Sequence, residues 1–194
     1  LGGRPPEWKL IDGVLAAPTI ERPKGGHLAT KANFGDVQIH LEFRTPYLPE
    51  KREEERGRGG VFLWGLYELQ ILDSFGFPRP TEGAKEFVDV ESLGAIFGQK
   101  AASDTAALPP GEWQAFDITA TVARFDADGT MTRSAEVTVF LNGTLIHDRV
   151  PLRKPTEDAP LQDSDIKSGL VLQNAGQPVE YRNLWYVPLD GPSK

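Results

Sequence analysis

Cysteine is absent from this chain of 194 residues, and its absence excludes several chemistries at once. A chain without cysteine has no disulfide framework, no thiolate nucleophile and no cysteine-ligated zinc or iron–sulfur site. Long apolar runs are absent too, since none approaches the roughly 20 residues that a membrane helix needs. Residues 1–6 do not have the apolar centre of a signal peptide. We therefore expect no membrane span, while export of a mature chain stays open.

Positive charge is scarce as well. The 21 Lys and Arg stand against 28 Asp and Glu, so the formal net charge is −7. Binding to a phosphate backbone needs a basic face, and we therefore do not expect nucleic acid as a partner. With 39% hydrophobic and 25% charged residues, the composition is that of an ordinary globular protein. The length predicts a single domain over residues 1–194.

Helical periodicity is a further missing pattern, because no segment keeps an apolar period of 3.6 residues. Residues 37–44 instead alternate strictly, with apolar side chains at odd positions and polar ones at even positions. This period of two is typical of a strand with one face on a core. Further strands are predicted over residues 60–64, 67–73, 116–122, 137–141, 169–173 and 179–187.

The dipeptide Asn142-Gly143 predicts a tight hairpin between two of these apolar stretches. Both residue types tolerate the positive φ that such a turn requires. The many short strands are separated by turns rich in Gly and Pro, and no helices alternate with them. Together these patterns indicate an all-β protein built as an antiparallel β-sandwich or barrel.

Common catalytic and metal-binding motifs are absent. There is no Gly-x-Ser-x-Gly elbow and no glycine-rich phosphate loop, so serine hydrolase and nucleotide chemistry are unsupported. The three histidines, His27, His40 and His147, are too scattered to predict a metal triad, and we name no metal ligand. The many acidic residues leave a divalent cation such as calcium as an option, although no Asp-x-Asn-x-Asp loop is present.

The segment from Tyr67 to Ser74 has the most informative polar residues. Glu68 and Gln70 share one face of the predicted strand, about 6.6 Å apart, whereas Asp73 has the opposite parity unless a bulge intervenes. The segment resembles the Glu-x-Asp-x-x-Glu signature of laminarinase-type glucanases, in which two carboxylates act as nucleophile and acid/base. Five residues of strand span roughly 16 Å, against the roughly 5.5 Å that retaining catalysis needs. An ordinary retaining glucanase is therefore disfavoured.

Each candidate also has an ordinary structural interpretation. Glu68 could be a solvent-facing carboxylate, and Arg182 could pair with an acid on a neighbouring strand. His40 lies on the polar face of its strand, where solvent and a ligand groove are equally plausible. Trp64 could pack in a core instead of serving as a platform for a sugar ring.

The order of several short segments resembles the 3-keto-disaccharide hydrolase domain family. The similarity extends from Trp8 to Leu189, nearly the whole chain. Each matching segment is weak by itself, and their shared order is the specific feature. The segments are residues 8–13, 34–37, 42–44, 60–63, 67–73, 94–97, 111–113, 141–143, 172–173 and 181–184.

This resemblance implies a concanavalin A-like jelly roll of the lectin/glucanase type, with a ligand groove on one concave sheet. It also implies a carbohydrate ligand, namely glycosides oxidised at C3 of the sugar, and an extracellular or periplasmic location. A ketone at C3 acidifies the C2 proton, so one positioned base can expel the C1 substituent by elimination before water adds. We predict Glu68 or Asp73 as that base.

Five further residues complete the predicted site. Gln70, Gln173 and Arg182 are expected to bind the substrate or to stabilise the enolate. Trp64 and His40 are added as substrate-binding candidates.

The chain departs from the usual pattern of the family at several positions. Trp64 stands in place of an Arg, Phe97 in place of a Tyr and Ala175 in place of a His. Two functions of different classes therefore stay open, a glycoside-cleaving enzyme and a non-catalytic carbohydrate-binding module. A protein-interaction sandwich is a third option, and the sequence does not give the oligomeric state.

Overall fold

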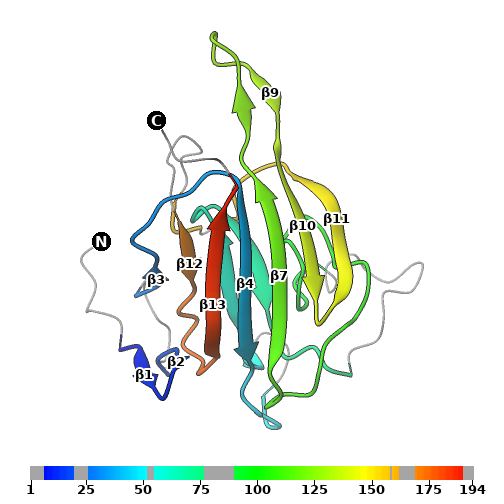
Figure 1. Cartoon of the computed structure of the whole chain (residues 1–194). Helices are drawn as coiled ribbons and strands as arrows, with labels where there is room; N and C mark the ends of the chain where they lie inside the picture. Colours follow the sequence, from blue (N-terminus) through cyan, green and yellow to red (C-terminus); the bar gives the residue numbers. More distant parts are fainter. Residues whose placement is uncertain are drawn as a thin grey trace.

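The computed structural model describes residues 7–19, 26–51, 55–76, 90–157, 159–161 and 169–189. These residues form 13 strands, arranged as two sheets that pack face to face and one short hairpin (Figure 1). Every pair of neighbouring strands is antiparallel. The predicted antiparallel β-sandwich is confirmed.

The larger sheet has seven strands in the order β1-β2-β13-β4-β7-β10-β11. Neighbours in space are rarely neighbours in sequence, since the last strand of the chain lies between the second and the fourth. The bounds are β1 (Lys9–Ile11), β2 (Val14–Ala16), β4 (Val37–Arg44), β7 (Gln114–Thr121), β10 (Ala135–Leu141), β11 (Thr144–Leu152) and β13 (Glu180–Pro188).

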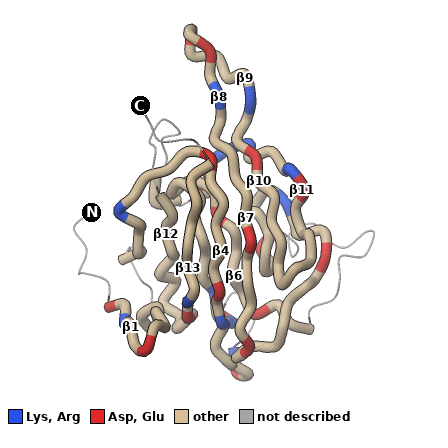
Figure 2. The backbone as a smooth tube through the Cα atoms, in the orientation of Figure 1, with Lys and Arg blue, Asp and Glu red and all other residues tan. Residues whose placement is uncertain are grey.

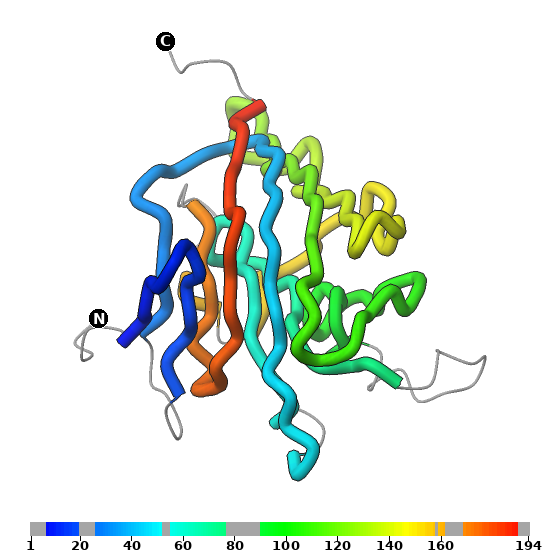
Figure 3. Tube along the Cα trace, turned by 60° about the horizontal axis from the view of Figure 1, so that its bottom comes forward, coloured from blue at the N-terminus to red at the C-terminus, as the bar shows by residue number. Residues whose placement is uncertain are grey.

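The smaller sheet has four strands in the order β3-β12-β5-β6 and forms the second layer of the sandwich (Figures 1 and 3). Its bounds are β3 (Leu28–Ala29), β5 (Gly59–Leu63), β6 (Tyr67–Ile71) and β12 (Leu170–Leu172). Strands β8 (Arg124–Phe125) and β9 (Met131–Arg133) form a separate hairpin that projects beyond the sheets. Basic residues lie on both arms of this hairpin (Figure 2).

The core lies between the two sheets, and alternation along each strand decides which side chains enter it. In β4 the odd-numbered residues are fully buried, which confirms the predicted period of two. Strands β5 and β6 supply the facing apolar side chains, Val61, Leu63, Tyr67, Leu69 and Ile71. Each fully buried aliphatic side chain contributes roughly 1.5–3 kcal/mol to folding, so this layer positions both sheets firmly.

The predicted hairpin at Asn142-Gly143 is confirmed. Strands β10 and β11 pair directly on either side of it, with Leu141 opposite Thr144. Both turn residues have positive φ, 52° at Asn142 and 79° at Gly143. Asn142 also ties the turn to the sheet, because its Oδ1 accepts a hydrogen bond from the Ala115 N–H at 2.8 Å.

The described part of the chain contains no helix with the length and apolarity that crossing a membrane requires. Within the same residues, no group of three or more His, Asp or Glu side chains is placed to hold a metal ion.

Candidate active site

The polar side chains of β6 lie on the side of the smaller sheet that faces away from the core. Glu68 is directly opposite Phe62 on β5, and Gln70 is opposite Gly60. Residues directly opposite one another in an antiparallel pair share a face. Phe62 packs with Val171 in a small cluster separate from the main core. Glu68 and Gln70 therefore lie on this outer face of the four-stranded sheet.

This outer face is nevertheless shielded from solvent. Glu68 is 3% exposed and Gln70 is 0% exposed. The Glu68 N–H donates to Oγ1 of Thr156 at 3.0 Å, and the Gln70 N–H donates to the Ala95 carbonyl at 2.9 Å. Backbone segments near residues 95 and 156 therefore border β6. The interpretation of Glu68 as a solvent-facing carboxylate is wrong.

Gly60 makes room for the carboxyl group of Glu68. A Cβ atom on residue 60 would lie 2.3 Å from Oε1 of Glu68 and 2.9 Å from its carboxyl carbon. Glycine alone has no Cβ, so it alone lets the carboxyl group lie against the β5 backbone. The carboxyl group thus lies over Gly60, whose cross-strand neighbour is Gln70.

One oxygen of the buried Glu68 carboxyl group, Oε1, has no hydrogen-bond partner among the described residues. Burial raises the pKa of Glu68 from 4.5 to about 7, and the positive charge of Arg58 offsets this rise only in part. Near neutral pH the group is divided between acid and carboxylate, which is the condition for accepting a proton and returning it.

Two amide oxygens around Gly60 also lack partners. Oε1 of Gln70 and Oε1 of Gln173 are buried and accept no hydrogen bond within the described ranges. The Gln173 N–H donates to the Gly60 carbonyl at 2.8 Å, which fixes Gln173 beside this glycine. An unpaired buried acceptor costs roughly 1–3 kcal/mol. Three such oxygens around one glycine suit a ligand that brings hydroxyl donors, as a sugar does.

Arg58 supplies a positive charge to this site. It directly precedes β5 and has the same parity as Gly60, and its charge acts on the pKa of Glu68. Its guanidinium carbon lies 5.7 Å from the centroid of the Phe97 ring. Arg58 was not among the predicted site residues, although its parity with the strand over residues 60–64 could have indicated it.

His27 extends the same row across the sheet. The pairing of Leu172 with Leu28, continued by one residue, places His27 opposite Gln173. Nδ1 of His27 accepts a hydrogen bond from the Asn174 N–H at 3.1 Å, so the ring proton is on Nε2. Burial lowers the pKa of His27, which favours the neutral ring. No sequence signal identified this residue, because β3 is only two residues long.

Comparisons with known proteins define the family. The family of 3-keto-alpha-glucoside-1,2-lyase-like domains matches residues 2–186. The chain belongs to this family. Membership supports a carbohydrate-active enzyme of the lyase or hydrolase type, and it confirms the resemblance seen in the order of segments. The comparison with curated proteins gave no match.

Two solved structures support the fold of this 3-keto-alpha-glucoside-1,2-lyase-like domain. An inferred glycosyl hydrolase from Parabacteroides distasonis ATCC 8503 is 31% identical, with a TM-score of 0.77 over 94% of this chain and 75% of that one. A second inferred glycosyl hydrolase from the same organism is 18% identical, with a TM-score of 0.61 over 94% and 83% of the two chains. The second similarity supports the fold alone.

Three of the predicted site residues lie together in the structure, whereas Asp73 is engaged in an ion pair with Arg56. Glu68, Gln70 and Gln173 meet around Gly60, as described above. Asp73 is 3% exposed, and its Oδ2 accepts hydrogen bonds from Nη2 and Nε of Arg56 at 2.6 and 3.1 Å. Its other oxygen accepts the Phe75 N–H at 3.2 Å. Both Asp73 oxygens are therefore engaged by the protein itself.

Trp64 lies in the main core of the domain. It is 3% exposed, and its indole N–H donates to the Gly35 carbonyl at 3.0 Å. The edge of one ring meets the face of the other between Trp64 and Tyr67, with centroids 6.1 Å apart. Trp64 has a φ of 53° because it begins the turn from β5 to β6. Its ring is covered, so the structure offers no stacking surface for a sugar at this residue.

His40 and Arg182 lie on the other sheet. They belong to β4 and β13, on the face that points away from the core, and so the structure does not bring them to Glu68. Arg182 donates to Oε2 of Glu42 at 2.5 Å, which is the ion pair considered as its structural interpretation. Nδ1 of His40 lies 2.7 Å from Oδ1 of Asp117.

Proposed function

We propose that this domain cleaves 3-keto glycosides by base-assisted elimination followed by addition of water. The observation that supports the proposal most directly is the Glu68 carboxyl group, which is buried, without a hydrogen-bond partner at Oε1 and has a pKa of about 7. The neighbouring acid in sequence, Asp73, is bound to Arg56. Among the residues that the structure describes, this site has one available carboxylate, which suits a reaction that needs one base better than a reaction that needs two.

The proposed reaction begins at C2 of the oxidised sugar. The Glu68 carboxylate takes the C2 proton, and the electron pair forms an enolate across C2 and C3. When the C3 ketone reforms, a double bond forms between C1 and C2 and the C1 substituent leaves, taking up a proton. Water then adds its oxygen to C1 and a proton to C2. The products are the 3-keto sugar and the released alcohol.

The surrounding residues have complementary roles in this proposal. The cationic Arg58 side chain stabilises the negative charge that develops on the C3 oxygen, as preorganised donors do in other enolate-forming sites. Gln70 and Gln173 accept hydrogen bonds from sugar hydroxyl groups through their unpaired oxygens. The burial of Glu68 excludes water from the base and so makes its carboxylate a stronger proton acceptor.

The proposal is tested by measuring product release by NMR from a 3-keto glucoside and from the matched unoxidised glucoside. We expect cleavage of the keto substrate only. Glu68→Gln should reduce this turnover by roughly a hundredfold or more, because general-base catalysis contributes about 10²–10⁴. The matched control is Glu136→Gln on β10, a glutamate on the outer face of the larger sheet, which should leave turnover unchanged. Full turnover by Glu68→Gln, or equal cleavage of the unoxidised glucoside, would contradict the proposal.

The outer face of the larger sheet favours a second candidate function, glycan binding without catalysis. Trp185 is 45% exposed there and stacks on His40, with ring centroids 5.3 Å apart. The guanidinium carbons of Arg44 and Arg182 lie 4.7 and 4.0 Å from the centroid of the Trp113 ring. Aromatic rings framed by polar groups suit sugar stacking. If neither glucoside is cleaved, and titration with either one causes saturable chemical-shift changes at Trp185, glycan binding without catalysis would be favoured.

A further inference from the structure

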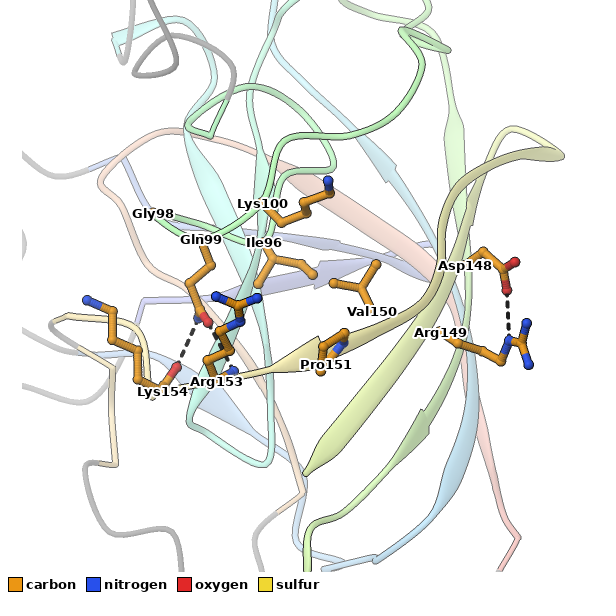
Figure 4. A pocket seen from close by; sticks show the side chains of 10 residues that line it. All are labelled: Ile96, Gly98, Gln99, Lys100, Asp148, Arg149, Val150, Pro151, Arg153 and Lys154. Atoms are coloured by element: carbon orange, nitrogen blue, oxygen red, sulfur yellow. Dashed lines mark hydrogen bonds and ion pairs between the residues drawn. The ribbon is translucent and has the colours of Figure 1, made fainter. Parts of the chain in front are cut away.

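A pocket separate from the Glu68 site lies where the segment from Ile96 to Lys100 meets the end of β11 (Figure 4). Its volume is about 530 Å³. Small-molecule sites usually measure roughly 300–1,000 Å³, so the pocket has the size of a ligand site. Its lining includes none of the four residues Arg58, Glu68, Gln70 and Gln173. It is therefore a second candidate site.

The pocket is positive in a protein that is negative overall. Its lining contains Lys100, Arg149, Arg153 and Lys154 and one acid, Asp148, so its formal charge is 4 − 1 = +3, against −7 for the whole chain. Asp148 accepts from Nε of Arg149 at 3.3 Å. None of Lys100, Arg153 and Lys154 has an ion pair with any residue that the structure describes. Burial is the main cause that lowers the pKa of His147, and the positive charge of Lys100 lowers it further.

The two walls of the pocket are held together by Gln99. Its Nε2 donates to the Lys154 carbonyl at 2.9 Å, and its Oε1 accepts from the Arg153 N–H at 3.2 Å (Figure 4). The Lys100 N–H donates to the Ile96 carbonyl at 3.0 Å and closes the loop that bears Gln99. The backbone that positions Lys100 and Arg153 is thus fixed before any ligand arrives, which lowers the entropic cost of binding.

A bulge in β11 shapes the third side of the pocket. Val137 pairs with Val150 and Val139 pairs with His147, so two residues of β11 stand opposite Thr138 alone. Arg149 is one of these two and has a φ of 47°, a left-handed conformation that non-glycine residues adopt rarely. Its N–H donates to Oγ1 of Thr138 at 3.1 Å. Bulges of this kind are frequent next to binding sites, where they redirect side chains.

The floor of the pocket is apolar. The side chains of Ile96 and Val150 point toward one another and Pro151 lies beside them, while the charged ends of Lys100 and Arg153 lie on opposite sides of Ile96 (Figure 4). An apolar floor with cations at its edge suits a ring with C–H groups and one negative substituent. We propose that this pocket binds a sugar that bears a carboxylate, sulfate or phosphate group, with the ring on the apolar floor and the anion beside Lys100 or Arg153 at the edge.

The test is an NMR titration of the isotope-labelled chain at constant ionic strength with glucuronate, glucose 6-sulfate, glucose 6-phosphate, glucose and free sulfate. We expect saturable shifts at the amides of Gln99, Lys100 and Val150 with at least one charged sugar. Affinity for glucose should be at least about tenfold weaker, because it lacks the charge that the two cations recognise. The charged sugar with the highest affinity identifies which of the three anionic groups the pocket prefers.

A pair of double variants separates this pocket from a general charge effect. The double variant Lys100→Gln/Arg153→Gln should lower the affinity for the charged sugar at least about tenfold. The control variant Lys9→Gln/Arg133→Gln removes the same charge at exposed, distant positions and should change this affinity less than about twofold. Equal binding of glucose or of free sulfate, shifts outside the pocket, or full affinity in the pocket variant would overturn the proposal. Turnover of an uncharged 3-keto glucoside should not change in either variant, so the two proposals fail separately.

Discussion

At the scale of single residues, the burial of Glu68 affects catalysis and stability in opposite directions. A carboxyl group with a pKa of about 7 is a suitable base near neutral pH, and the same burial disfavours its charged form in the folded protein. No hydrogen bond from the described residues compensates Oε1. Glu68 is therefore a group that the proposed function requires although its charged form lowers the stability of the fold.

The stability of the protein should accordingly depend on the ionisation of Glu68. Because its folded pKa of about 7 lies above the ordinary 4.5, the folded chain binds more protons than the unfolded chain between these pH values. The free energy of unfolding should fall as pH rises through this window, by at most about 3 kcal/mol from this group. Urea unfolding should show that Glu68→Gln gains stability relative to wild type between about pH 5 and pH 8. If the free energies of unfolding of Glu68→Gln and wild type differ by the same amount at pH 5 and pH 8, this prediction is wrong.

Asp73 should behave as a structural residue. Asp73→Asn weakens the buried pair with Arg56, and a hydrogen bond to a charged group contributes about 1.5–3 kcal/mol. We expect the free energy of unfolding to fall by about 2 kcal/mol, while turnover of a 3-keto glucoside by folded protein stays within about twofold of wild type. Chemical unfolding and initial rates at matched folded concentrations measure both effects. A loss of turnover comparable to that of Glu68→Gln would instead assign Asp73 to the chemistry.

At the scale of elements, the pairing of β5 with β6 creates the site. Gly60→Ala places a methyl carbon 2.3 Å from Oε1 of Glu68, which is closer than non-bonded atoms can approach, so the carboxyl group must move. We expect turnover to fall at least about tenfold, because the displaced carboxyl group no longer has the geometry that proton transfer needs. Gly60 does not have the positive φ that would strain an alanine, so the backbone itself should not be strained by the substitution. Initial rates on the 3-keto glucoside measure the effect.

The control for this variant is Gly129→Ala in the β8–β9 turn. A Cβ on residue 129 meets no atom within 4 Å, and its φ of 79° strains an alanine. This control should cost roughly 1 kcal/mol of stability and leave turnover unchanged. Equal turnover in the two variants would mean that Gly60 does not position Glu68.

The elements also show what the sequence could predict. Period-two alternation identified β4 and its buried face, and Asn142-Gly143 identified the β10–β11 turn, because both are local patterns. Alternation assigns a residue to one side of its strand and does not say which sheet the strand joins. His40 and Glu68 both have outward parity, yet they lie on different sheets with the core between them. Long-range pairing decides that placement.

The sequence also did not predict that the outer face of β6 is buried. Glu68 and Gln70 alternate with apolar residues, which is the usual pattern of a half-exposed strand. Loops distant in sequence border this strand, through Thr156 on one side and Ala95 on the other. Strand parity singled out Glu68 and Gln70, and the resemblance to the family added Gln173 and the chemical roles of all three. His27 became a candidate only once the pairing of β3 with β12 was known, whereas the parity of Arg58 with the predicted strand could have indicated it from the sequence.

At the scale of the whole molecule, one β-sandwich presents three chemically distinct surfaces. The outer face of the smaller sheet has the buried Glu68, the outer face of the larger sheet has exposed aromatic and ion-paired side chains, and the side of the sandwich has a basic pocket. The core between the sheets separates the first two surfaces. Substitutions on one surface should therefore affect the others little, since distant sites are usually additive.

If Glu68 removes the C2 proton during cleavage, the fate of that proton distinguishes elimination from direct hydrolysis. The 3-keto glucoside is cleaved in D₂O and the product is analysed by NMR at early times, with free 3-keto glucose incubated alone to measure spontaneous exchange. We expect deuterium at C2 of the released sugar, or an unsaturated sugar if water has not yet added, and neither product with Glu68→Gln. A released 3-keto sugar that keeps hydrogen at C2 would contradict proton removal by Glu68, because direct hydrolysis at C1 leaves that bond intact.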